Sequence, residues 1–470
     1  MSSPPITKSH ALLHIGSVLV AALMMLWPAF YNGFPLLYPD SMTYLDDGRI
    51  VARAVFLHRM TGYYGMRSFF YSLVILPLHW NVTVWPVIVL QSLLMAYVLW
   101  LLVRVVATRW RMPSYLTLAL ALSLCTSLSW YVSLVLPDIL GPALYLSIFL
   151  LVFAGQTLSR MERWSLYAIA WWGITSHATH LLLAAGLCLL LGFVALLQRL
   201  RKRPRSISPR GLASVVLVLL AAAGAQMALH WYLYGAPSLN GRRPPFLTAR
   251  IIADGPGRWY LNRHCGEVRW IVCGHLQQLS SDPDQILWGA DGLWQNLSDA
   301  DGKRLLNEEM PFVLATLKTY PREQLARSAA NFWAQLNIFG YDDLDPSGWV
   351  TESFDSVMPA AKASYLNSRQ ARNALPRDQF SDLQYWVVRS SVVIILAALP
   401  WIWLRRPAYL GGLAAIIVPV VVANALITGA LSMVEDRLQS RVVWLLPLLA
   451  GVLLLGWLAN RQKTSSSLPQ

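Results

Sequence analysis

Long apolar runs recur along this sequence and limit the folds open to it. Of its 470 residues, 56% are hydrophobic and only 13% are charged, whereas soluble domains keep about a quarter of their residues charged. A helix of about 20 apolar residues can cross the hydrocarbon core of a bilayer. Because helices satisfy their own backbone polar groups in lipid, the sequence predicts an all-α polytopic membrane protein.

About ten stretches have the length and apolar character of membrane spans. They are residues 12–31, 86–105, 114–134, 139–158, 164–180, 181–198, 211–231, 385–404, 408–430 and 441–459. Basic residues cluster in short loops between them, such as 104–111, 160–163 and 199–205. The positive-inside rule places these loops in the cytoplasm. We therefore expect a multi-pass protein of a bacterial inner membrane with both termini cytoplasmic, and the net charge of +14 needs no nucleic acid partner.

This topology divides the chain into three parts. Residues 1–231 form a seven-helix membrane module whose first outer loop, 32–85, is acidic. Residues 232–384 form a large periplasmic loop domain, expected to be mixed or mainly helical. Residues 385–470 supply three further spans and a short cytoplasmic tail.

The unusual polar residues fall on the predicted outer side. Asp40, Asp46 and Asp47 lie in "YPDSMTYLDDGR", where residues 41–57 can form an interfacial helix. The other outer turns carry Asp138 in "VLPDIL", His177 and His180 in "SHATH", Arg242 and Arg243 in "NGRRPPF", and Glu435, Asp436, Arg437 and Arg441 in "VEDRLQSR". Carboxylates can take a proton from an attacking hydroxyl or hold a metal, and arginines bind phosphate with bidentate hydrogen bonds. Together they indicate group transfer from a lipid-linked phosphate.

This order of features resembles the GT-C superfamily of polytopic glycosyltransferases. Its marks are an acidic residue in the first outer loop, interfacial helices, and a second acidic residue at the next outer turn, here Asp40 in "YPDSMTY" and Asp138 in "LPDIL". "EDRLQSRVVWLLP" is similar to an Arg-Tyr…Pro stretch near the last helices of these enzymes, with Leu438 in place of Tyr. In layout, residues 1–231 resemble the lipid-A aminoarabinose transferases and the protein O-mannosyltransferases.

The resemblance implies transfer of a sugar from a polyprenyl-phosphate-linked donor to the hydroxyl of a lipid, glycan or protein, with inversion at the anomeric carbon. It implies that Asp40 accepts the hydroxyl proton and that Asp138 positions a substrate or shares a divalent metal with Asp40. No cofactor is certain, because the family is mixed in its use of metals. The predicted phosphate-binding residues are Arg242, Arg243, Arg437 and Arg441. Further predicted site residues are His177, His180, Asp47 and Tyr44.

Other interpretations of these residues stay open. Asp40 follows Pro39 and can cap a helix, Asp47 can lie on a solvated face or pair with Arg49, and the histidines can form an interfacial turn. An O-antigen-ligase-type transferase with a lipid diphosphate donor would depend mainly on the arginines. A lipid or sugar transporter would place ionisable residues in mid-span, and an accessory protein would need no chemistry.

Two of the four cysteines, Cys265 and Cys273, lie in the predicted outer loop. A disulfide between them would fit an oxidising compartment. Two free thiols are an alternative, as is a zinc site with His264 and His275. The other two cysteines lie in apolar runs, where we expect inert core residues.

Overall fold

The protein is described by a computed structural model that covers residues 8–58, 67–107, 110–202, 206–239, 243–405 and 409–465. Within these ranges the chain is helical and has no β-strand apart from an isolated bridge between Leu36 and Leu134. Six of the helices described are long and apolar enough to cross a membrane. The protein is therefore a helical, multi-pass membrane protein.

Long helices account for six of the predicted spans. They are α5 (Trp85–Val106), α10 (Ala178–Leu200), α11 (Pro209–Tyr234), α20 (Arg377–Arg405), α21 (Leu410–Leu431), and α22 (Asp436–Val443) with α23 (Leu445–Ser465). Shorter helices occupy the other four stretches: α1 (Lys8–Met25) with α2 (Trp27–Asn32), α6 (Arg111–Cys125) with α7 (Leu128–Ser133), α8 (Leu140–Phe153), and α9 (Arg160–Ser176). A helix of 15 residues rises only about 22 Å, which is less than the hydrocarbon core. The number of ten spans therefore stays a prediction.

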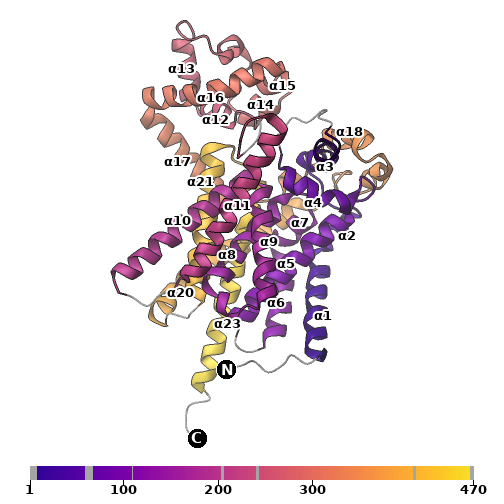
Figure 1. Cartoon of the computed structure of the whole chain (residues 1–470), viewed down its shortest axis with the longest axis vertical. Helices are drawn as coiled ribbons and strands as arrows, with labels where there is room; N and C mark the ends of the chain where they lie inside the picture. Colours follow the sequence, from indigo (N-terminus) through magenta and orange to yellow (C-terminus); the bar gives the residue numbers. More distant parts are fainter. Residues whose placement is uncertain are drawn as a thin grey trace.

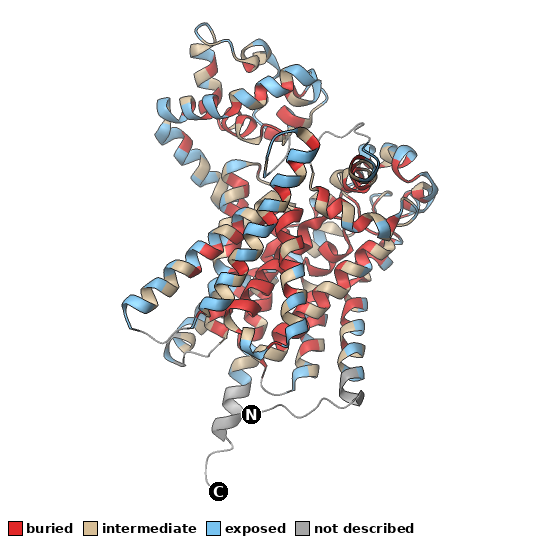
Figure 2. Ribbon diagram, viewed as in Figure 1, coloured by how far each residue is buried: buried red, intermediate tan, exposed pale blue. Residues whose placement is uncertain are grey.

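Helix α8 forms the centre of the bundle. All of its residues except the last are buried, and it packs against α5, α9, α11 and α21. A helix that is apolar on every face is stable only where other helices cover it all round. Figure 2 shows this buried centre, with exposure increasing toward the outside of the bundle.

Helix α1 begins and α23 ends at one end of the bundle, and a helical lobe stands at the other (Figure 1). The helical lobe, residues 246–319, contains α12 (Phe246–Ala253), α13 (Pro256–His264), α14 (Pro283–Trp288), α15 (Leu293–Asn296) and α16 (Asp299–Thr319). It has its own apolar core, into which Met433 and Leu438 of the bundle also pack. Cys265 and Cys273 form a disulfide in this lobe. We call the end of the bundle at which the helical lobe stands the lobe end.

The rest of the predicted loop domain packs differently. Helix α17 (Pro321–Asn337) lies beside α21. Helices α18 (Gly348–Val357) and α19 (Lys362–Leu366) follow it and join the core of the bundle, where α18 packs on α3. The described residues of the predicted loop are thus mainly helical, and its boundaries at 232 and 384 stay a prediction.

Two short helices form the predicted acidic first loop. Helix α3 (Pro39–Leu57) matches the predicted interfacial helix, and α4 (Phe69–His79) packs against it. Gly48 permits this contact, because a Cβ atom there would lie 2.6 Å from the Ser72 carbonyl oxygen. The pair positions the acidic residues of α3 beside the bundle.

Candidate functional site

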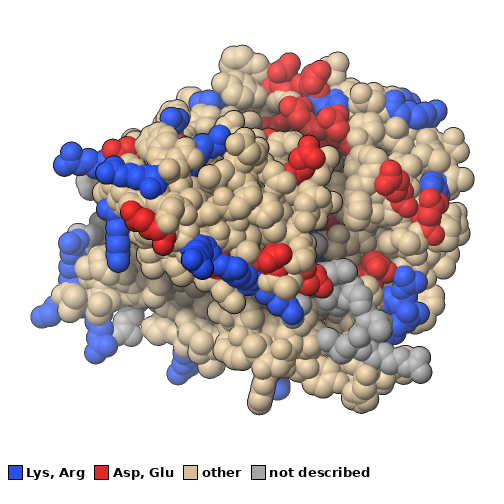
Figure 3. All heavy atoms as spheres, turned by 90° about the horizontal axis from the view of Figure 1, so that it is seen from above, with Lys and Arg blue, Asp and Glu red and all other residues tan. Residues whose placement is uncertain are grey.

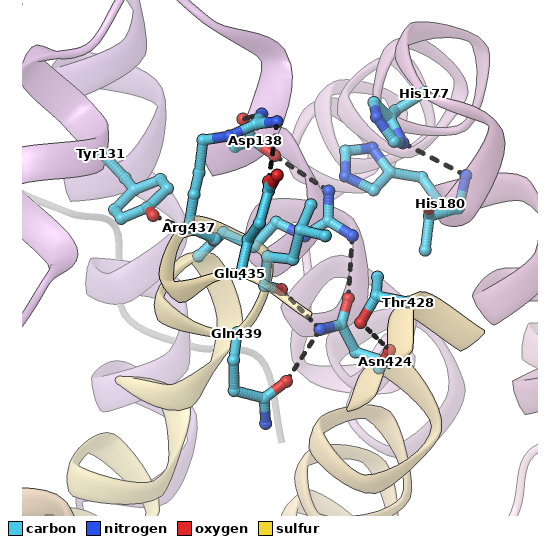
Figure 4. A network of polar contacts seen from close by, with 12 residues as sticks. Tyr131, Asp138, His177, His180, Asn424, Thr428, Glu435, Arg437 and Gln439 are labelled. Atoms are coloured by element: carbon cyan, nitrogen blue, oxygen red, sulfur yellow. Dashed lines mark hydrogen bonds and ion pairs between the residues drawn. The ribbon is translucent and has the colours of Figure 1, made fainter. Parts of the chain in front are cut away.

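Asp138 is the centre of a buried ion-pair network. It lies on the 3₁₀ turn Pro137–Ile139 that precedes α8, and it is 2% exposed. Arg441 donates from Nη1 to its Oδ1 atom at 3.0 Å, and Arg437 donates from Nη1 to its Oδ2 atom at 3.5 Å. The two arginines are four residues apart on α22, so they share one face of that helix. A single carboxylate therefore engages two guanidinium groups (Figure 4).

Asn424 of α21 supports this network from within an apolar helix. Its Oδ1 atom accepts a hydrogen bond from Arg441 Nη2 at 3.0 Å, and its Nδ2 atom donates to Leu438 O at 2.6 Å and to Gln439 Oε1 at 2.9 Å. Every polar atom of this buried amide thus has a partner, as buried polar groups require. The side chain of Asn424 fixes the orientation of Arg441 (Figure 4).

Arg437 connects the network to the start of α3. Its guanidinium carbon lies 4.1 Å from the centre of the Tyr38 ring, a cation–π contact. Its backbone amide donates to Asp343 Oδ2 at 2.8 Å, and its backbone carbonyl accepts from the Tyr131 hydroxyl at 2.9 Å. Glu435 Oε2 lies 4.0 Å from its Nη2 atom. The chain segments that carry Tyr38, Tyr131, Asp138 and Asp343 therefore meet at Arg437.

Asp40 lies in the first turn of α3 and forms an ion pair with Arg67. One turn farther along, the Tyr44 side chain is buried against Tyr71, with ring centres 5.0 Å apart. Burial raises the pKa of Tyr44, an effect that Arg67 opposes and Asp40 reinforces. The Tyr44 hydroxyl therefore stays protonated beside the pair.

Glu435 lies where the charges of the site converge. Its pKa is raised to about 8, mainly by burial; Arg437 lowers it, and Asp343, Asp284 and Asp40 raise it. These carboxylates come from the helical lobe, helix α3 and the segment after α17. Asp40 and Arg437 thus lie within electrostatic reach of one side chain. The structure brings together Asp40, Asp138, Arg437 and Arg441 at the lobe end.

His177 lies between two helices, because α9 ends at Ser176 and α10 begins at Ala178, and His180 lies in the first turn of α10. His177 caps α10, its Nδ1 atom accepting a hydrogen bond from Thr179 N at 3.2 Å. His180 Nδ1 contacts Gly173 O at 2.9 Å, while its buried Nε2 atom has no hydrogen-bond partner among the described residues. The turn lies next to Asp138 in Figure 4. Both rings therefore have local structural roles at the edge of the network.

The sequence-based alternative for Asp47, a solvated face or a pair with Arg49, is wrong. Asp47 is buried, and its Oδ2 atom has no hydrogen-bond partner among the described residues. Arg49 instead pairs with Asp46 at 2.7 Å. Burial, with help from Asp46, raises the pKa of Asp47 to about 8, against the opposing effect of Arg67. The next residue, Gly48, packs closely against α4 on the inward side of α3.

Of the two arginines predicted at the start of the outer loop, the structure describes Arg243, which contacts the helical lobe. Arg242 lies outside the described residues. Arg243 Nη2 donates to Glu309 Oε2 of α16 at 2.8 Å, and Glu309 also accepts from the backbone amides of Leu247 and Thr248. The carboxylate partner of Arg243 is thus in the helical lobe, where the pair holds the start of α12.

The possibility of a divalent metal finds no ligand set in the part of the chain that is described, where no three His, Cys, Asp or Glu side chains are arranged to hold an ion. Beside Arg437 is a cavity of about 10 Å³, lined by residues that include Trp130, Tyr131, Tyr341 and Asp343. This volume is close to the smallest that admits one water molecule. A larger ligand in this cavity therefore requires the neighbouring side chains to move.

Sequence reasoning missed several members of the site. Asn424 could have been found from the sequence, because it is a polar amide within an otherwise apolar stretch. Tyr38 had no distinguishing signal, because aromatic residues are common at membrane interfaces, and its contact with Arg437 is visible only in the structure. Arg67 had no signal, because its pairing with Asp40 depends on how α4 folds back on α3.

Viewed from the lobe end, the surface carries both acidic and basic side chains, several of them side by side (Figure 3). Comparisons of the chain with protein-family models, curated proteins and solved structures found no match. The interpretation of the site therefore depends on its geometry and chemistry.

Proposed function

We propose that this protein is a membrane glycosyltransferase that uses a polyprenyl-phosphate-linked sugar. In this proposal the lobe end faces the periplasm, and the acceptor hydroxyl belongs to a lipid, glycan or protein. One observation carries the proposal: Arg437 is held between Asp138, Glu435 and the Tyr38 ring, within electrostatic reach of Asp40. A proton acceptor and an anion-binding group thus lie together at one end of a membrane helix bundle.

The proposed reaction is a single displacement. The acceptor hydroxyl oxygen forms a bond to the anomeric carbon while the bond from that carbon to the phosphate oxygen breaks. The hydroxyl proton passes to the Asp40 carboxylate, which acts as general base. The lipid phosphate leaves with the bonding electrons, and the sugar configuration inverts. Fixed positive charge near the leaving oxygen would stabilise the transition state.

Arg437 is the better-placed arginine for that leaving group. Its side chain is 12% exposed, whereas that of Arg441 is 1% exposed. Its contact with Asp138 is also the longer of the two, 3.5 Å against 3.0 Å. In this proposal Arg437 exchanges Asp138 for the phosphate, and Arg441 stays with Asp138 as a positioning residue. Arg67 keeps the Asp40 side chain oriented before the acceptor arrives.

The test is a transfer assay on Asp40→Asn in proteoliposomes with a panel of polyprenyl-phosphate sugars. We expect Asp40→Asn to reach the membrane in folded form and to lose about 10²–10⁴-fold of the transfer rate, the usual contribution of a general base. Asp46→Asn is the matched control, because Asp46 lies on the same helix but pairs at the surface with Arg49. Full activity in Asp40→Asn would remove Asp40 from the base role.

A ligase-type transferase with a lipid diphosphate donor is the second candidate. The observation that favours it is the gathering of two arginines around Asp138, next to His177. In a transferase of this type the arginines make the main contribution to catalysis, and Asp40 has no catalytic role. Loss of transfer in Arg437→Ala with full activity in Asp40→Asn would favour this candidate, whereas loss in both variants supports the first.

A further inference from the structure

Helix α17 has its polar and apolar faces reversed relative to a helix of a soluble domain. Its buried residues are the amides Gln324 and Gln335, while Leu325 is 71% and Trp333 66% exposed. A helix surrounded by water normally turns its apolar stripe inward. The outward face of α17 therefore requires an explanation other than contact with water.

Hydrogen bonds hold the polar face inward. Gln324 Nε2 donates to Asp254 Oδ2 at 2.7 Å, and Asn331 Nδ2 donates to Asp254 Oδ1 at 2.8 Å. Gln335 accepts from the Glu435 backbone amide at 2.9 Å and donates to the Glu435 carbonyl at 2.8 Å. Rotating the helix to bury Trp333 would break these bonds and leave polar groups unpaired, which is costly. The apolar outward face is thus a fixed feature of the fold.

Helix α17 lies directly against two candidate membrane spans. Helix α17 packs closely along α21, where a Cβ atom at Gly429 would lie 2.6 Å from Asn331 O. Its last residue, Asn337, accepts a hydrogen bond from Arg389 of α20 at 2.8 Å. Figure 1 places α17 between the helical lobe and α21.

The neighbouring turn of α20 has the composition of a membrane boundary. Arg389 lies 4.9 Å from the centre of the Tyr385 ring, and Trp386 is exposed. Tyr and Trp are enriched where a membrane protein meets the headgroup layer. Because Asn337 bonds to Arg389, the C-terminal end of α17 lies at this boundary. Trp333 is one turn away, and its carbonyl accepts a bond from Asn337 Nδ2.

We propose that α17 lies in the headgroup layer at the lobe end and presents its outward face to phospholipid. The outward residues of its C-terminal half, Ala329, Ala330, Trp333 and Ala334, are apolar and exposed. Its N-terminal half carries the exposed charges Arg322, Glu323 and Arg327, which suit the water side. From Leu325 to Trp333 the helix rises about 12 Å, so the two residues should differ in depth. This inference does not depend on the proposed transferase activity.

Site-directed spin labelling in phosphatidylethanolamine–phosphatidylglycerol vesicles tests this inference. Labels are placed on Trp333→Cys and Leu325→Cys in a chain whose two free cysteines, Cys125 and Cys188, are replaced by serine and alanine. Relaxation by oxygen, which concentrates in lipid, is compared with relaxation by a water-soluble nickel chelate. Two reference positions complete the set: Val393→Cys on the exposed face of α20, and Ser356→Cys at an exposed position of α18.

We expect the oxygen-to-nickel ratio at position 333 to approach that at 393 and to exceed that at 356 several-fold, with position 325 between them. Ratios at both α17 positions equal to that at 356 would overturn the proposal, because α17 would then face water. Low accessibility to both reagents would overturn it as well, since a protein partner or a second copy would then cover the face.

Discussion

Replacing Arg441 by methionine tests whether the buried network stabilises the fold. Arg441 is 1% exposed and donates to Asp138 at 3.0 Å and to Asn424 at 3.0 Å. Removing one partner of a buried ion pair typically costs about 3–5 kcal/mol, because the other charge is left uncompensated. Arg437 stays near Asp138 and compensates part of its charge. We therefore expect the free energy of unfolding to fall by about 3 kcal/mol, at the lower end of that range.

The measurement is reversible unfolding in mixed micelles with increasing dodecyl sulfate, followed by tryptophan fluorescence. Arg49→Met is the matched control, because Arg49 pairs with Asp46 at the surface, where ion pairs contribute about 0–1 kcal/mol. A third variant combines Arg441→Met with Asp138→Asn. Since the substitutions remove both charges of one pair, their combined cost should be at least about 1 kcal/mol less than the sum of the single costs.

Two results would refute this reasoning. A loss below about 1 kcal/mol in Arg441→Met would place the pair among surface ion pairs in strength. Strict additivity in the combined variant would mean that Asp138 and Arg441 do not stabilise each other. Either result would remove Arg441 from its positioning role.

Two further predictions concern stability. The pKa of Asp47 is raised to about 8 by burial, so the folded protein holds this proton to about pH 8, whereas the unfolded chain loses it near pH 4. The free energy of unfolding should therefore fall as pH rises across that window, and Asp47→Asn should make this fall smaller, while Glu435, whose pKa is also raised to about 8, still contributes; an unchanged profile would contradict the burial of Asp47. Separately, Cys265→Ser with Cys273→Ser opens a disulfide with a sequence separation of 8, which should cost the helical lobe about 2.5 kcal/mol. Limited proteolysis should then cut the lobe first and leave the bundle intact, and equal resistance in the variant would exclude a stabilising role for the bond.

The membrane helices could be predicted from the sequence because lipid selects for length and apolar character, both of which are local properties. The turn between α9 and α10 could also be predicted, since basic residues at both ends of 164–198 require an even number of crossings. The burial of Asp47 could not be predicted, because the side of α3 that faces the protein depends on how α3 packs against α4. Nor could the partner of Arg243, because Glu309 is 66 residues away along the chain.

The ion pairs of Asp138 give Arg437 and Arg441 different freedom to bind a substrate. Arg441 is enclosed by Asp138 and Asn424, so its guanidinium has no freedom to meet a substrate. Arg437 is partly exposed, and its longer contact with Asp138 can be exchanged for another anion. Lysine keeps the charge but lacks the planar fork that binds phosphate in a bidentate manner. If Arg437 meets the leaving phosphate, Arg437→Lys should lower transfer at least about tenfold with little change in unfolding, whereas Arg441→Lys should lower the free energy of unfolding first. The opposite pattern, loss of stability in Arg437→Lys and loss of transfer alone in Arg441→Lys, would contradict this assignment, because exposure and hydrogen bonding would then not determine which arginine is free to act.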